Sequence, residues 1–261
     1  MCVLLFTIFI ENEVNLHTLE IEISSTYYNT CFDKILESIL QSTNFIHNIK
    51  YLKLYISNYN ENTVIKNRIL PLIHSHQNLK KILIGDNYLS SYQSLLLSND
   101  YNCSNTLNTI IFYYVNFKGL INLDKVFEQL NCSSIVLQNL GQILPSKLEY
   151  LCLSLYHINA NDFEIFLKNS QDTFIKKFLI YNNEGQDILP SIKKYIMKKK
   201  RANYLAINDS SFEAALFNSS YKSKELFSLK DDVKEFELYN IKVQSYNSLV
   251  IRISDFVNEI D

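Results

Sequence analysis

Apolar residues recur along the chain in a fixed arrangement, in which two spacer residues follow the first apolar position and one spacer follows the second. Eight clear copies and one weaker copy, Cys132/Ile135/Leu137, occur. The clear copies are Leu16/Leu19/Ile21, Ile49/Leu52/Leu54, Leu79/Ile82/Ile84, Leu107/Ile110/Phe112, Leu148/Leu151/Leu153, Ile175/Phe178/Ile180, Ala202/Leu205/Ile207 and Val233/Phe236/Leu238. Because alternate side chains of a β-strand share one face, each copy predicts a short strand with its second and third positions buried.

The spacing of the copies is close to that of a known class of repeat. First positions of successive copies are 25 to 33 residues apart, with one exception of 16 residues between Cys132 and Leu148. Leucine-rich repeats have a period of roughly 20–29 residues, with one strand in each repeat. The 16-residue step is too short for a strand, a helix and both turns. The weak copy has therefore either lost its helix or is not a repeat.

Helical patterns fill the intervals between the strand copies. Apolar residues three and four positions apart predict amphipathic helices in 32–40, 120–130 and 188–196. Asn161-Asp162 predicts the N-cap of another helix, and 245–260 predicts a C-terminal one. The alternation predicts an α/β leucine-rich-repeat solenoid of about eight to nine divergent repeats. In this horseshoe the parallel strands line the concave face and the helices the convex face.

The turns after the strands are predicted to be irregular. Leucine-rich repeats carry Asn or Cys three residues after the third apolar position. Among the clear copies only Asn87 and Asn183 meet this rule. The expected organisation is a partial N-terminal helix or cap in 1–13, the solenoid in 14–244 and a C-terminal capping helix in 245–261.

Five stretches carry a resemblance to a known family: NLHTLEIEI (15–23), NTLNTIIFYYVNFKGLINLDKVFEQLN (105–131), PSKLEYLCLSL (145–155), NDFEIFLKNSQDTFIKKFLI (161–180) and FSLKDDVKEFELYNIKV (227–243). They resemble the leucine-rich-repeat region of fungal F-box/leucine-rich-repeat proteins, from about Glu11 onward. The resemblance implies a non-catalytic substrate-recognition module of a cullin–RING ubiquitin ligase. The Leu-Pro-containing start of an F-box is absent here, so a ligase adaptor is expected as a partner only if an F-box lies upstream.

Composition limits the classes of function. Lys and Arg number 25 against 27 Asp and Glu, so no strong field toward nucleic acid or membranes is expected. Five cysteines without a CxxC pair indicate a reduced intracellular protein, expected in the cytoplasm, with the nucleus as the alternative. The apolar stretch 1–10 is too short to span a bilayer and is interpreted as the end of a helix.

The sequence contains no recognisable constellation for catalysis, metal binding or cofactor binding. His74 and His76 form the one close histidine pair, but no Cys, Asp or Glu stands beside them at metal spacing. A solvated helix end is the favoured interpretation of that pair. Gly-rich phosphate loops and a nucleophile elbow are also lacking. We therefore expect no enzyme, no metal and no cofactor, and a protein of unknown identity as the partner.

The strongest local charge is the basic segment Lys193–Arg201, KKYIMKKKR. Such a segment is typical of nuclear localisation or nucleic-acid binding, which gives an alternative function. It also fits the last turn of a helix, where cations meet the negative end of the helix dipole. The second interpretation is favoured, because the rest of the chain is nearly neutral.

Seven residues are predicted to face the concave surface and to contact a protein partner, because they alternate with the buried apolar positions of the strands. Tyrosine is favoured at interfaces, since it supplies contact area at low entropic cost. Packing at the rim of the core is the open alternative for the tyrosines. The predicted site comprises Lys53, Tyr55, Ile111, Tyr113, Cys152, Leu179 and Tyr181.

Overall fold

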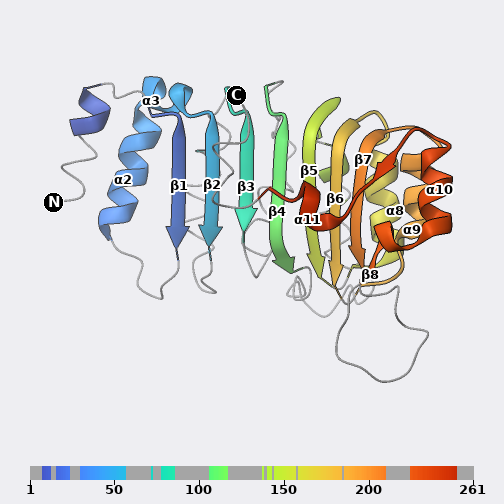
Figure 1. Ribbon diagram of the computed structural model, residues 1–261. Coiled ribbons are helices and arrows are strands. Elements are labelled where there is room, and N and C mark those ends of the chain that lie inside the picture. Colours follow the sequence, from blue (N-terminus) through green and yellow to red (C-terminus); the bar gives the residue numbers. More distant parts are fainter. Residues whose placement is uncertain are drawn as a thin grey trace, which may run out of the picture.

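The protein forms one sheet whose strands follow one another in chain order. The structure, a computed structural model, describes residues 8–12, 16–23, 30–56, 72, 78–85, 106–116, 137, 140–142, 144–156, 158–183, 185–209 and 224–251. In these ranges the sheet has nine strands in the order β1-β2-β3-β4-β5-β6-β7-β8, with β9 paired to β7 (Figure 1). The strands are β1 (Thr18–Ile23), β2 (Tyr51–Ile56), β3 (Lys81–Gly85), β4 (Thr109–Asn116), β5 (Lys147–Tyr156), β6 (Phe174–Asn183), β7 (Ala202–Asp209), β8 (Lys224–Glu225) and β9 (Lys242–Val243).

Strands β1–β7 and β9 pair in parallel, whereas β8 is antiparallel to β7. Seven of the predicted copies form β1–β7, and equivalent apolar positions stand side by side. The second positions run across the sheet as Leu19, Leu52, Ile82, Ile110, Leu151, Phe178 and Leu205. The third positions run as Ile21, Leu54, Ile84, Phe112, Leu153, Ile180 and Ile207. The prediction of an α/β protein with parallel strands is therefore confirmed.

Helices pack against the face of the sheet that carries these apolar rows. The helices are α2 (Thr30–Gln41), α3 (Thr43–Asn48), α8 (Ala160–Asn169), α9 (Leu189–Ile192), its π-helical continuation η3 (Lys193–Met197) and α10 (Lys230–Glu237). Buried side chains such as Ile39, Phe163 and Ile192 join the strand residues in one core cluster. The helices predicted in 32–40 and 188–196 are confirmed, and the one in 120–130 lies outside the described residues. We call this side the core face and the opposite side the second face.

The eighth copy, Val233/Phe236/Leu238, predicts a strand, but the structure has helix α10 there. Val233 and Phe236 are three residues apart, a spacing that also suits one side of a helix. Phe236 is fully buried, whereas Leu238 is 81% exposed. The prediction is wrong because only two of the three apolar positions face the core, and a helix accommodates that pair.

The weak copy Cys132/Ile135/Leu137 is not a strand of the sheet. Strand β4 pairs directly with β5, so no strand is inserted between them. Leu137 is helical, while Cys132 and Ile135 lie outside the described residues. The short 16-residue step in the pattern therefore does not correspond to an additional strand between β4 and β5.

The C-terminal helix is shorter than expected, whereas residues 8–11 are helical as expected for the N-terminal end. Helix α11 covers only Tyr246–Leu249, and Val250 after it is extended, with φ −67° and ψ 127°. A continuous helix over 245–260 is therefore wrong, and residues 252–261 lie outside the described residues.

The N-cap of α8 is Asn159, whose side-chain oxygen accepts a hydrogen bond from the Asn161 backbone N–H at 2.8 Å. The expected cap at Asn161-Asp162 was thus two residues late.

A buried polar pair lies one position earlier than the predicted asparagine positions. Asn182 and Asp209 are paired in the register of β6 and β7, and both are buried. The Asn182 amide donates to the Asp209 carboxylate at 3.0 Å and to the Gln186 carbonyl at 2.9 Å. A Cβ at Gly185 would lie 2.0 Å from the Asn182 side-chain oxygen, so only glycine leaves room for this turn.

Two helices end in the same hydrogen-bonded turn with a non-glycine residue in the left-handed region. Lys200 has φ 53° and Asn240 has φ 61°. In the first turn the Arg201 N–H donates to the Ile196 carbonyl and the Lys200 N–H to the Met197 carbonyl, each at 3.0 Å. These two bonds define a Schellman motif, in which glycine is the usual left-handed residue. Lysine in the left-handed conformation carries a steric cost, and asparagine adopts this conformation more readily.

We expect Lys200→Gly to raise the free energy of unfolding by about 0.5–1 kcal/mol, because it removes the Cβ from a left-handed residue. Urea denaturation followed by circular dichroism measures the change. Lys199→Gly is the matched control, since Lys199 has no positive φ and should lose stability. Equal destabilisation by both substitutions would contradict the argument.

Candidate functional site

The second face of the sheet brings most of the predicted contact residues into one row. Register places Glu20, Lys53, Leu83, Ile111, Cys152, Leu179 and Ala206 side by side across β1–β7. Four of the seven predicted residues, Lys53, Ile111, Cys152 and Leu179, are in this row. The alternation of the strands is sufficient to group them, as the sequence predicted.

The three predicted tyrosines stand two residues further along their strands. Tyr55 pairs with Gly85, and Gly85 pairs with Tyr113. The Tyr113 side chain lies outside the described residues. Tyr181 pairs with Ser154. A Cβ at Gly85 would lie 2.5 Å from Tyr55 Cε2, so the Tyr55 ring lies directly against the glycine backbone.

The row is covered by the chain itself. Ile111, Cys152 and Leu179 are exposed by 3%, 2% and 0%. They form a second apolar cluster, separate from the core, against which the C-terminal segment packs. Figure 1 shows α11 and the residues after it crossing the strands on the side opposite to α8 and α10. The cluster consists of Leu83, Ile111, Tyr150, Cys152, Leu179 and Ala206, with Tyr51, Tyr246, Leu249, Val250 and Ile251 packed on it.

Backbone hydrogen bonds hold this C-terminal segment at three points. The Gln244 N–H donates to the Leu205 carbonyl at 2.9 Å, and the Tyr246 N–H to the Glu225 carboxylate at 3.2 Å. At the far end the Tyr150 hydroxyl donates to the Leu249 carbonyl at 3.2 Å and accepts from the Ile251 N–H at 3.1 Å. Tyr150 therefore bonds the backbone where α11 ends, independently of the side chains there.

The Tyr246 side chain enters the cluster. Its hydroxyl lies 3.6 Å from Cys152 Sγ, and its ring centroid lies 6.0 Å from that of Tyr181. Burial raises the pKa of the Cys152 thiol to about 11, against the opposing effect of hydrogen bonds with Tyr246 and Tyr150. The thiol is therefore neutral at physiological pH, which makes Cys152 a packing residue and a poor nucleophile.

The N-terminal strands carry charge on the same face. Lys53 Nζ lies 3.2 Å from Glu20 Oε2. Lys81, which is 1% exposed, places its ammonium 4.6 Å from the centre of the Tyr51 ring. The second face thus carries these charged residues at β1–β3, and the apolar cluster extends from Leu83 of β3 to Ala206 of β7. The apolar end is where Tyr246–Ile251 lies.

The sequence did not single out Tyr150, Glu225 or Tyr246. Tyr150 immediately precedes the second apolar position of its strand, so the alternation rule already places it on the second face. The partnership of Glu225 with Tyr246 joins residues 21 positions apart in a non-repetitive region. No local pattern in the sequence encodes that contact.

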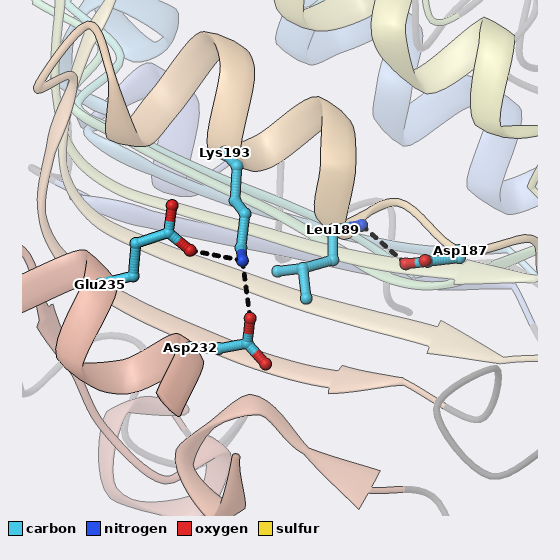
Figure 2. Close-up of polar contacts among 5 residues, drawn as sticks. All are labelled: Asp187, Leu189, Lys193, Asp232 and Glu235. Carbon is cyan, nitrogen blue, oxygen red and sulfur yellow. Dashed lines mark hydrogen bonds and ion pairs between the residues drawn. The ribbon is translucent and has the colours of Figure 1, made fainter. Parts of the chain in front are cut away.

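Three of the six cations in the basic segment Lys193–Arg201 make ion pairs or hydrogen bonds with other parts of the chain. Lys193 Nζ lies 2.7 Å from Asp232 Oδ1 and 2.5 Å from Glu235 Oε2, which links η3 to α10 (Figure 2). Partial burial lowers the pKa of Lys193, but its hydrogen bonds to the two carboxylates outweigh burial and hold that pKa above the usual value. Lys194 Nζ lies 2.7 Å from Glu164 Oε1. This hydrogen bond lowers the pKa of the Glu164 carboxyl group.

Arg201 closes the end of helix α8. Its guanidinium donates to the carbonyls of Leu167 at 2.9 Å and Thr173 at 3.1 Å, and to the Ser170 carbonyl. Burial lowers the pKa of Arg201 to about 10, against the attraction of Asp172, so the group stays cationic at pH 7. It satisfies carbonyls that the helix leaves unpaired and complements the helix dipole. These contacts differ from the favoured interpretation, because Arg201 meets the end of α8 rather than the end of its own helix, and Lys193 and Lys194 pair with carboxylates.

In the described part of the chain, a metal site, a membrane-spanning helix or a catalytic pocket has little support. Within it, no three His, Cys, Asp or Glu side chains gather closely enough to hold a metal ion. His74 and His76 lie outside these ranges. No described helix is long and apolar enough to cross a membrane. An open pocket between residues 10–11 and 41–48 is lined mainly by polar side chains and contains no cluster of titratable groups.

Comparison with known proteins gives no relative. No protein-family model matches the chain, and no curated protein or solved structure is significantly similar to it.

Arg201→Met is expected to lower the free energy of unfolding by about 2–4 kcal/mol, because it leaves several buried carbonyls without donors. Chemical denaturation measures the loss. Lys198→Met, at an exposed position of the same segment, is the matched control and should change stability by less than about 0.5 kcal/mol. Similar effects of the two substitutions would contradict the role assigned to Arg201.

Proposed function

We propose that this chain is a non-catalytic protein-interaction module, built as a leucine-rich-repeat solenoid, that holds a segment of a partner protein on the second face of its sheet. The observation that carries the proposal is the apolar row Ile111–Cys152–Leu179. This row is distinct from the core, yet it is covered by the one-turn helix α11 and the residues that follow it. A face that already binds one polypeptide segment has the chemistry to bind another.

The repeat itself supports the solenoid proposal. Seven strands have equivalent apolar positions in register. In the described residues, the chain after each strand packs on the core face. A strand followed by such a segment is the unit of a leucine-rich repeat. The resemblance to fungal F-box/leucine-rich-repeat proteins extends the proposal to substrate recognition for a cullin–RING ubiquitin ligase. An adaptor of that ligase is a partner only where an F-box accompanies the repeats.

The proposal predicts that partner binding depends on the two half-buried tyrosines of this face. In quantitative affinity purification, Tyr55→Ser/Tyr181→Ser should reduce recovery of at least one protein by roughly tenfold, because aromatic anchors dominate interface energies. Leu238→Ser is the control, since Leu238 is 81% exposed at the end of α10, outside this face. A set of captured proteins that both variants retain equally would refute the function.

Nucleic-acid binding through Lys193–Arg201 is the alternative function. Lys193, Lys194 and Arg201 are engaged within the protein, which leaves Lys198, Lys199 and Lys200 exposed. Two lost phosphate contacts would lower the slope of log affinity against log salt by about 1.8. We expect Lys198→Ala/Lys199→Ala to leave that slope unchanged in a titration with duplex DNA and RNA. A reduced slope would favour the alternative.

A further inference from the structure

The geometry points to a linear-peptide groove on the second face, occupied in this structure by the chain's own Tyr246–Ile251. This inference rests on the proposed function and names the chemistry of the partner. The groove accepts an uncharged segment with a tyrosine followed, three to five residues later, by aliphatic side chains. The chain's own segment, QSYNSLVI from Gln244 to Ile251, is an intramolecular competitor for it.

The contacts separate the groove from the structural core. The side chains under the segment belong to the second cluster, not to the core cluster that unites the sheet and its helices. The segment is half-exposed itself, with Asn247 and Ser248 directed to solvent. Its removal would therefore uncover apolar surface while leaving the sheet and helices packed.

The polar contacts are those of a peptide-binding site. The Glu225 carboxylate accepts the Tyr246 N–H at one end, and the Tyr150 hydroxyl bonds a carbonyl and an N–H at the other. These groups recognise main chain, so any polypeptide in the same conformation satisfies them. Side-chain selection then comes from the Tyr246 position, between Cys152 and Tyr181, and from the aliphatic positions after it.

An attached segment competes strongly with a free one. The segment follows directly on β9, which pairs with β7, so it is held beside its site at an effective concentration of at least about the millimolar range. Free peptide at micromolar concentration is therefore excluded from the wild-type groove. A partner gains access when its own segment binds more tightly or when the attached segment is weakened.

The test uses the full chain and a fluorescent peptide with the sequence of Gln244–Ile251. We expect the peptide to bind the Tyr246→Ala/Leu249→Ala variant at least tenfold more tightly than wild type, because the attached competitor is weakened. Adding Tyr150→Phe to that variant should weaken peptide binding about tenfold. The substitution removes the two hydrogen bonds of the Tyr150 hydroxyl but keeps the aromatic ring at position 150. A peptide with Ala in place of its Tyr246 is the matched control.

Labelling of Cys152 gives an independent readout. Alkylation at pH 8, followed for Cys152 alone by peptide-resolved mass spectrometry, should be at least tenfold faster in Tyr246→Ala/Leu249→Ala than in wild type. Added peptide should restore protection. If the double variant fails to fold by circular dichroism, Tyr150→Phe alone is used, and Cys152 should then be labelled several-fold faster than in wild type.

Three results would overturn the inference. The first is a folded double variant that binds no peptide and protects Cys152 as wild type does, or a Tyr150→Phe chain that protects Cys152 as wild type does. The second is a concentration-dependent dimer that accounts for Cys152 protection, which would make a second copy the occupant. The third is a partner that depends on Tyr55 and Tyr181 but is not displaced by the peptide, a result that leaves the proposed function standing. Peptide binding without any such partner supports the groove and refutes the function.

Discussion

The parallel register of β1–β7 is the constraint on which the rest of the structure depends. Side chains alternate between faces, so a slip of one residue in any strand would move its apolar pair off the core. With Leu52 beside Leu19 and Phe178 beside Leu151, each strand extends the same buried rows. The helices on the core face then have a continuous apolar surface to cover.

The same register also determines which residues lie on the second face. Once the core positions are set, the intervening residues must line up on the other side. Charged residues there meet one another, as Lys53 meets Glu20, while Ile111, Cys152 and Leu179 form an apolar strip. Exposed apolar strips are unfavourable unless something covers them. In this protein the cover is Tyr246–Ile251, which ties the end of the described chain to strands near its middle.

Polar contacts, buried at Arg201 and Asn182 and partly buried at Lys193, join successive strand–helix units in the C-terminal half. Arg201 of the turn before β7 completes the end of α8, and Lys193 of η3 contacts α10. Asn182 and Asp209 bond across β6 and β7. Each contact uses a group that would otherwise be costly to bury. They connect each unit with its neighbours, which keeps consecutive units in a defined relative position.

The sequence by itself determined strands β1–β7, their order and the sharing of faces, because apolar periodicity and alternation are local properties. It therefore also predicted that Lys53, Ile111, Cys152 and Leu179 share one face. The triplet rule failed at Val233/Phe236/Leu238, where a helix buries two of the three positions equally well. Only the tertiary structure decided what covers the second face, since the contacts of Tyr246 with Glu225 and of Leu249 with Tyr150 join distant residues outside the repeat. Such contacts depend on where the whole sheet places its surface, and no local pattern carries that information.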